Sequence, residues 1–177
     1  LDALSTEKVD NIEIGGRNYY IHSNRRIVKS GAGTLTFNDV NTPYGFYAVG
    51  DRDQTIDIRM YDVITENGYW TVSFDCRGSE GGSGRTVVNI NGLGQKTIYT
   101  NVDNDWHRVS LTVEVTNFDE ENPDNNFVYF KPSWNYLWYR NIKIEKGTKP
   151  SDWTPAPEDV QAEIDDAKQE ALTAAGN

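Results

Sequence analysis

The sequence predicts an all-β fold, an antiparallel two-sheet sandwich with short helical segments at its two ends. Its 177 residues include 15 glycines, 5 tryptophans, 10 tyrosines and 6 phenylalanines, which indicates many turns around an aromatic-rich core. Apolar and polar residues alternate in several short stretches. Glycine, asparagine and aspartate separate these stretches at intervals of roughly ten residues, as expected for a sandwich. The length suits one domain with an appendage.

The first residues carry a short helical pattern. Leu1 and Leu4 lie three residues apart and the stem of Lys8 follows four residues later, which is consistent with the last turns of a helix entering from upstream. We therefore expect a fragment of a longer protein in which residues 1–13 end an upstream helix or linker. Residues 14–154 form the predicted sandwich.

Strand patterns fill this body, most clearly from Tyr69 to Arg77, where every second residue is apolar. Such alternation is typical of an antiparallel strand with one buried face. Val109–Val115 and Ile56–Tyr61 follow the same pattern. Further strands are expected at 19–28, 33–37, 45–49, 86–90, 96–99, 126–130 and 137–145. The predicted core comprises Trp70, Val72, Phe74, Val109, Leu111, Val113, Ile142 and Ile144.

A helix is predicted at the C-terminal end, in residues 155–177. Two prolines precede it, acidic residues fill its first turn and Gly176 follows it, as in a capped helix. Small apolar residues recur at heptad spacing, at Val160, Ile164, Ala167, Ala171 and Ala174. A helix this short is marginal alone. We expect it to pair with copies of itself or to continue into a longer coiled coil.

Charge and apolar run length disfavour two classes of partner. The formal net charge is -10, from 17 basic and 27 acidic side chains, which opposes approach to nucleic acid and to anionic membranes. The longest apolar runs have four residues, far short of the roughly 18–20 that cross a bilayer. We expect no membrane insertion and no nucleic-acid partner.

Sequence motifs for catalysis and metal binding are lacking. Cys76 is the only cysteine, which excludes an intrachain disulfide, and neither His22 nor His107 belongs to an HExxH motif. No GxSxG motif occurs. Acidic turns at 103–105 and 119–124 lack the EF-hand pattern. A pair of carboxylates in a glycosidase arrangement stays open, because acidic residues are plentiful. The residues favour a protein that is not an enzyme.

Aromatic residues outnumber the places that one core offers. They cluster at 44–47, 127–130 and 134–139. Flat rings stack on the apolar faces of sugars, while arginine, aspartate and asparagine bond sugar hydroxyls. Two interpretations stay open, a ligand-binding face and a wholly structural use of these rings.

Both ends of the body resemble a known group. The segments 14–18 (IGGRN) and 139–160 (YRNIKIEKGTKPSDWTPAPEDV) are similar to modules in tail fibre, tail-tip and minor structural proteins of phages that infect Gram-positive bacteria. Between them, Tyr69–Arg77 and Asp105–Val113 resemble strands of jelly-roll carbohydrate-binding modules of the galactose-binding-like group.

This resemblance implies a jelly roll that acts as a non-catalytic accessory module of a phage tail protein and attaches the virion to host cell-wall polysaccharide. It also implies other tail proteins as partners, and a homotrimer formed through the helices. The alternative is a structural spacer or assembly domain that binds no sugar. Modules of this group often hold a structural calcium through an acidic pair in the last strand. The corresponding place here is Arg140–Asn141, which does not support that calcium, and we expect no cofactor.

The predicted sugar-binding surface combines rings for stacking with polar groups for directional bonds. Its residues come from a turn, a loop and the outward positions of strands. They are Trp134, Tyr136, Tyr44, Tyr47, Tyr129, Arg77 and Asp75.

Overall fold

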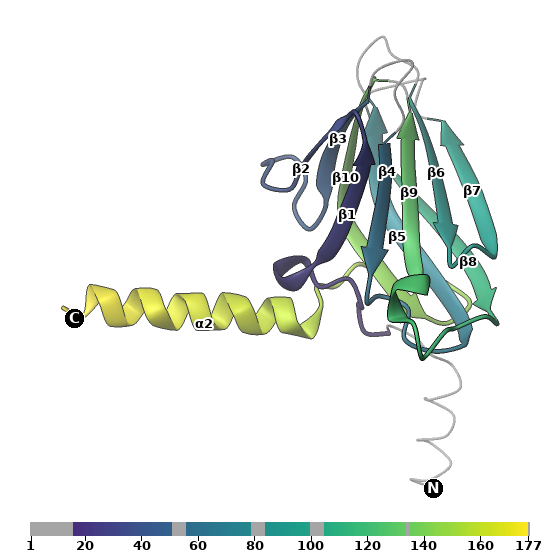
Figure 1. The fold of residues 1–177 in the computed structure, drawn as a ribbon. Coiled ribbons are helices and arrows are strands. Elements are labelled where there is room, and N and C mark those ends of the chain that lie inside the picture. The colour runs from purple at the N-terminus through teal and green to yellow at the C-terminus, as the bar shows by residue number, and fades with distance from the viewer. Residues whose placement is uncertain (1–15, 51–55, 79–83, 100–104, 134, 177) are drawn as a thin grey trace, which may run out of the picture.

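The computed structural model describes residues 16–50, 56–78, 84–99, 105–133 and 135–176. Two five-stranded sheets pack face to face, and the strands within each pair antiparallel (Figure 1). Sheet A has the order β1 (Arg26–Gly31), β4 (Ile56–Tyr61), β9 (Phe127–Ser133), β6 (Arg85–Ile90) and β7 (Gly94–Tyr99). Sheet B has the order β2 (Thr34–Thr36), β3 (Phe46–Gly50), β10 (Asn135–Lys146), β5 (Gly68–Gly78) and β8 (His107–Val115). This arrangement confirms the predicted antiparallel jelly-roll sandwich.

The described residues also form three helical elements. They are the 3-10 turns η1 (His22–Asn24) and η2 (Pro123–Asn125) and the helix α2 (Pro157–Ala174). The C-terminal helix is therefore confirmed, whereas the helix expected within residues 1–13 lies outside the described residues. None of the helices in the described segments is both long enough and apolar enough to span a membrane.

The core lies between the sheets and follows the predicted alternation. Trp70, Val72 and Phe74 on β5 are fully buried, and the Phe74 ring meets the Phe130 ring of sheet A at 4.9 Å, edge to face. Six of the eight predicted core residues are buried; Val109 and Leu111 are only half-buried. Both lie on β8, the edge strand of sheet B, where the second layer covers the sheet less completely.

The strand predicted at 19–28 is wrong in its first half, because β1 begins only at Arg26. Side chains take the backbone donors that a neighbouring strand would otherwise bind. The Tyr20 N–H donates to Asn18 Oδ1, and the His22 and Ser23 N–H groups donate to the carboxylate of Asp159. The chain therefore forms the turn η1 here instead of a strand.

A bulge divides the outer face of β10 into two parts. Arg140 pairs with Asp75 and Lys143 pairs with Ser73, so β10 advances three residues while β5 advances two. Asn141 takes a positive φ of 51° inside the bulge, and its N–H donates to Pro43 O at 3.0 Å. The outward side chains of β10 that precede the bulge are exposed or partly exposed, whereas those that follow it, Lys143 and Glu145, are buried under another segment of the chain.

The cover is the segment 147–154, which we call the strap. It returns across the outer face of β10, where Lys143 and Glu145 are fully buried. Lys143 Nζ donates to Ser151 Oγ and to Asp152 O, both at 2.8 Å, and the Ser151 hydroxyl donates to Glu145 Oε1 at 2.6 Å. The strap thus satisfies two buried charged groups that would otherwise be costly.

Asn18 ties the strap to the start of the sandwich. Its Nδ2 donates to Ile142 O at 2.8 Å and to Thr154 O at 3.0 Å, while its Oδ1 accepts from Tyr20 N and Ile144 N. The side chain is 2% exposed. One amide therefore joins the first described segment, β10 and the end of the strap.

Helix α2 contacts the sandwich near its start. Asp159 is 3% exposed and accepts from the η1 backbone at 2.8 and 2.9 Å, Arg17 pairs with Glu158 at 2.6 Å, and the Tyr44 hydroxyl donates to Glu163. Beyond these contacts the helix runs away from the sandwich (Figure 1). Val160 and Ile164 are more than 40% exposed.

Replacing Asn18 with alanine should lower the free energy of unfolding by about 2–4 kcal/mol, because several buried backbone groups lose their partner at once. Chemical denaturation measures this change. Asn24→Ala is the matched control, since Asn24 is exposed and the change should cost less than about 0.5 kcal/mol. Equal effects for the two variants would contradict the role assigned to Asn18.

His22 should make stability depend on pH. Burial, and next the Arg25 charge, lower its pKa below the usual 6.5, although Asp159 acts in the opposite sense. The folded state therefore prefers the neutral ring, whose Nδ1 can accept a hydrogen bond from the Tyr20 hydroxyl at 2.8 Å. Stability from this group is present above about pH 6.5 and is lost as pH falls through the folded-state pKa. Melting temperatures between pH 7 and 5 should fall less steeply in His22→Gln than in the wild type. Parallel slopes would contradict this account.

Candidate functional site

A series of planar side chains lies on the outer face of sheet B, before the β10 bulge. We call it the ring stack. Its members come from β3, β10, β5 and the residue just before β8, and they are Tyr47, Tyr136, Trp138, Arg140, Arg77 and Trp106. Tyr136 is 45% exposed, and the other members are partly exposed.

Strand register brings these residues together. Trp138 pairs with Tyr47 on one side and with Arg77 on the other, so the three side chains form one row across β3, β10 and β5. Residues directly opposite in a sheet point to the same face. Tyr136 and Arg140 share that face because each lies two residues from Trp138. The stack therefore stands on three adjacent, hydrogen-bonded strands.

The rings lie nearly parallel. Tyr47 and Trp138 have centroids 4.8 Å apart at 25°, and Tyr47 and Tyr136 have centroids 6.1 Å apart at 6°. The guanidinium carbon of Arg77 lies 4.7 Å from the Trp138 centroid and 5.3 Å from that of Trp106. Arg140 covers Trp106 at 4.0 Å. Each of the six members thus contacts at least one other member through a ring–ring or cation–π interaction.

Asp75 holds the arginines beside the stack in place. Its carboxylate accepts from Arg140 Nε at 3.0 Å, from Asn141 Nδ2 at 3.2 Å and from Arg108 Nη1 at 3.4 Å. The Asp75 side chain is only 17% exposed. Its oxygens are therefore engaged within the protein, and its role in this arrangement is to position Arg140 and Arg108.

Arg77 has no such partner. Its Nε is buried and has no hydrogen bond to any residue that the structure describes. Two indole rings lie over its guanidinium. Of the two arginines in the stack, Arg77 is thus the one without a hydrogen bond to those residues.

The structure divides the seven predicted site residues among different places. Tyr47, Tyr136, Arg77 and Asp75 come together on sheet B. Tyr129 lies on sheet A between Arg59 and Asn89, where its hydroxyl donates to Asp57 at 2.6 Å, and burial followed by this bond raises its pKa.

Tyr44 belongs to the helix junction, where its ring lies 4.8 Å from that of Trp153. Trp134 lies outside the described residues.

Sequence reasoning missed Trp138, Arg140 and Trp106 as members of the site. Trp138 and Arg140 follow Tyr136 at steps of two within a predicted strand, and this spacing alone places them on the face of Tyr136. Trp106 carries no comparable signal, because it precedes its strand and reaches the stack only through the pairing of β8 with β5.

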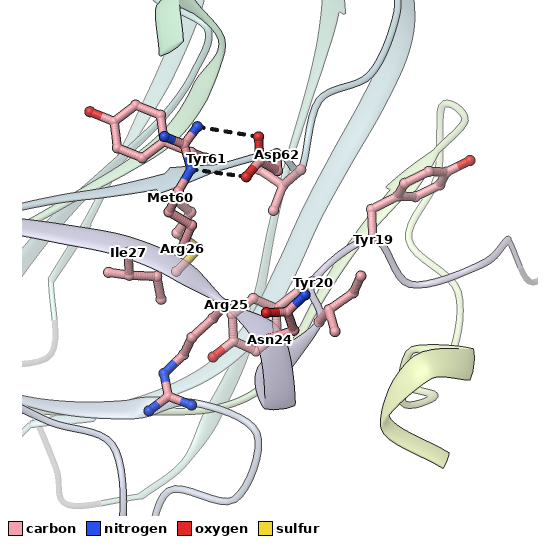
Figure 2. A pocket seen from close by; sticks show the side chains of 11 residues that line it. Tyr19, Tyr20, Asn24, Arg25, Arg26, Ile27, Met60, Tyr61 and Asp62 are labelled. Carbon is pink, nitrogen blue, oxygen red and sulfur yellow. Dashed lines mark hydrogen bonds and ion pairs between the residues drawn. The ribbon is translucent and has the colours of Figure 1, made fainter. Parts of the chain in front are cut away.

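A small cavity near η1 is too small for a saccharide. It measures about 30 Å³ and lies among Tyr20, Asn24, Met60 and the Arg26–Asp62 pair, which Figure 2 shows joined by two contacts. A cavity of this kind holds a few water molecules at most. A wider depression of about 400 Å³ beside it is open, and there Arg25 covers the Phe37 ring at 3.9 Å and donates to His22 O.

The described residues offer little for metal or nucleophilic chemistry. Across them, His, Cys, Asp and Glu form no group of three that could hold a metal ion. Cys76 is fully buried, and burial raises the pKa of its thiol to about 12, so the reactive thiolate is scarce at neutral pH.

No protein-family model and no curated protein matches the sequence. Solved structures with a similar arrangement include the enzymatically active domain of tailspike protein 4 of bacteriophage CBA120, with 14% identity, a TM-score of 0.43 and 73% of this chain covered. The chain spans about a fifth of that tailspike chain, 20% of its length.

Two carbohydrate-binding modules are also similar. TmCBM61, solved with β-1,4-galactotriose, has 11% identity, a TM-score of 0.41 and coverage of 74% of this chain and 99% of its own. The CBM1 module of BiXyn10A has 10% identity, a TM-score of 0.49 and coverage of 73% and 95%. At this level of similarity no ligand and no residue role is carried over to this chain.

Proposed function

We propose that this domain is a non-catalytic carbohydrate-binding module whose ligand lies on the ring stack. The observation that carries the proposal is the row Tyr47–Trp138–Arg77, in which rings and a guanidinium stand side by side on one partly exposed sheet face.

The chemistry of this face suits a saccharide. Sugar rings present apolar C–H faces that pack on aromatic rings, and their hydroxyls accept from N–H and O–H donors. The stack offers both kinds of group, with the Tyr47 and Tyr136 hydroxyls and the Arg77 guanidinium next to the rings. A face that stands on a sheet, outside an enclosed cavity, favours a polymer over a small molecule.

The same face is poorly equipped for hydrolysis. Glycosidases use two carboxyl groups that flank the scissile bond, one to protonate the leaving oxygen and one to attack or activate water. Asp75, the carboxylate that contacts Arg140 of the stack, is bound by two arginines and an asparagine. Its oxygens already accept from these three side chains, so it is a positioning residue.

The finer proposal is that the module belongs to a phage tail protein, acts outside the cell on the virion, and attaches it to host cell-wall polysaccharide. The similarity of its two terminal segments to phage tail modules supports this context. A structural spacer is the second candidate, and a specific observation favours it. Asn18, Lys143, Glu145 and Ser151, which lie in those segments, all serve to fix the strap and the exit of α2.

Alanine at Trp138 or Tyr136 should weaken binding to purified wall polysaccharide by about tenfold or more, because each ring supplies stacking energy of order 1–3 kcal/mol. Pull-down and titration measure the binding, and product analysis of the same mixtures tests for cleavage. Tyr129→Ala is the matched control, since Tyr129 lies on the other sheet.

Three results separate the functions. Retention of unchanged saccharide that depends on Trp138 and Tyr136 supports the binding module, whereas released product would indicate an enzyme. If the wild-type protein neither retained nor cleaved saccharide, the result would support the structural spacer. If Tyr136→Ala lowered the melting temperature as much as a core variant does and left binding intact, the rings would have a structural role instead.

Helix α2 should drive parallel self-association, because Val160 and Ile164 continue a heptad seam yet remain exposed in one chain. These residues do not fix the number of chains, and the trimer is what the resemblance to phage tail fibres implies. Light scattering on the full chain and on a version ending at Pro155 measures this. We expect a mass three times that of the monomer for the full chain only. Equal monomer masses would contradict it. A trimer would link three stacks and raise avidity by ~10²–10⁴ over one site.

A further inference from the structure

Arg77 differs from the two arginines that lie nearest to it in the sheet. Arg140 and Arg108 both bind the Asp75 carboxylate, and Arg108 also donates to Asn141 O and Ser73 Oγ. Among the described residues, the Arg77 guanidinium has cation–π contacts with the Trp138 and Trp106 rings, and its buried Nε has no hydrogen-bond partner. The outer Nη groups of Arg77 likewise have no hydrogen bond to a described residue, and these are the donors that a ligand on this face can reach.

The cation–π contacts of Arg77 with Trp138 and Trp106 limit how a ligand can approach its guanidinium. Two indoles lie over the guanidinium, so a ligand approaches it through the N–H groups at the edge of its plane. These donors form a rigid fork that matches two oxygens of a carboxylate or a phosphate. A single sugar hydroxyl would use only part of that fork. The geometry therefore favours an oxyanion on the ligand.

Local charge supports an anionic ligand despite the acidity of the chain. Arg77, Arg108 and Arg140 stand on this face with Asp75 between two of them. Of the net charge of -10, half belongs to the residues after Pro157. Three of these acids, Asp165, Asp166 and Glu170, lie on the later part of helix α2, which runs away from the sandwich (Figure 1). Charges separated by more than about 8 Å are largely screened at physiological salt. Asp39, which lies near Tyr47 at the other end of the stack, is an acid that such a ligand would have to pass.

We propose that the ring stack selects acidic glycans, with Arg77 binding a carboxylate or phosphodiester oxyanion while the rings beside it pack against the sugar or polyol. The proposal rests on the carbohydrate-binding function above and names its ligand class. The shared chemistry is a repeating oxyanion on a hydroxyl-rich polymer. Its two sources are uronate residues and sugar or polyol phosphates.

Isothermal titration with two pairs of probes tests this selection. Galacturonate oligomers are compared with the same oligomers methyl-esterified, which removes the charge and keeps the backbone. Glycerol phosphate oligomers are compared with uncharged glycerol oligomers. We expect at least one acidic probe to bind ten times more tightly than its neutral counterpart, and this preference to shrink between 50 and 500 mM salt.

Variants connect the preference to Arg77. Arg77→Gln should abolish it, and Arg77→Lys, which keeps a point charge without the fork, should retain only part of it. Arg59→Gln removes an exposed arginine from sheet A, on the opposite side of the sandwich, and should leave the preference for the acidic probe intact. Melting temperatures of all variants show whether they are folded.

The outcomes distinguish the two proposals. Equal binding of acidic and neutral probes, a preference that survives Arg77→Gln, or no acidic probe binding better than its counterpart overturns the selection of acidic glycans. The carbohydrate-binding function survives that result if neutral saccharides still bind and Trp138→Ala weakens them. It fails together with the present inference only if no saccharide binds.

Discussion

The single extra residue in the β10 bulge is the constraint on which the rest of the structure depends. β10 lies in the middle of sheet B, and β3 and β5 fix its backbone on both sides. The bulge keeps Arg140 and Lys143 on the same outer face, although they lie three positions apart in the sequence. Its Asn141 and Ile142 N–H groups are held by the carbonyls of Pro43 and Tyr44. One end of the strand therefore presents the ring stack, and the other carries the strap.

The two halves of this face use charge in opposite ways. Beneath the strap, Lys143 and Glu145 are buried and hydrogen-bonded to Ser151, and Lys143 also to the Asp152 carbonyl, so they stabilise the path of the chain into α2. In the stack, Arg77 is stabilised by rings and keeps donors for a ligand. The first arrangement fixes the direction of α2, and the second serves recognition. One module can thus be both a connector and a binding face.

Alternation in the sequence predicted the sandwich because each strand has one buried face, as β5 shows. Alternation did not predict the burial of Lys143 and Glu145. Both occupy outward positions of the strand, but the strap covers them, and the position of the strap depends on contacts outside the strand. Alternation placed Tyr129 outward correctly and could not assign its sheet, since a period of two identifies a face and carries no information on strand order. Tyr44 was predicted to belong to the site but lies at the helix junction. It contacts Trp153 and Glu163, which are far from it in the sequence, and alternation carries no information on such contacts.

Indole N–H resonances in a ¹⁵N-labelled sample test most directly whether the ring stack is the ligand face. Trp106 and Trp138 belong to the stack, Trp70 is in the core, and Trp153 is at the helix junction. During titration with wall polysaccharide fragments, the account predicts that the Trp106 and Trp138 signals shift with a common affinity while those of Trp70 and Trp153 stay in place. Saturable binding that leaves Trp106 and Trp138 unmoved would contradict it.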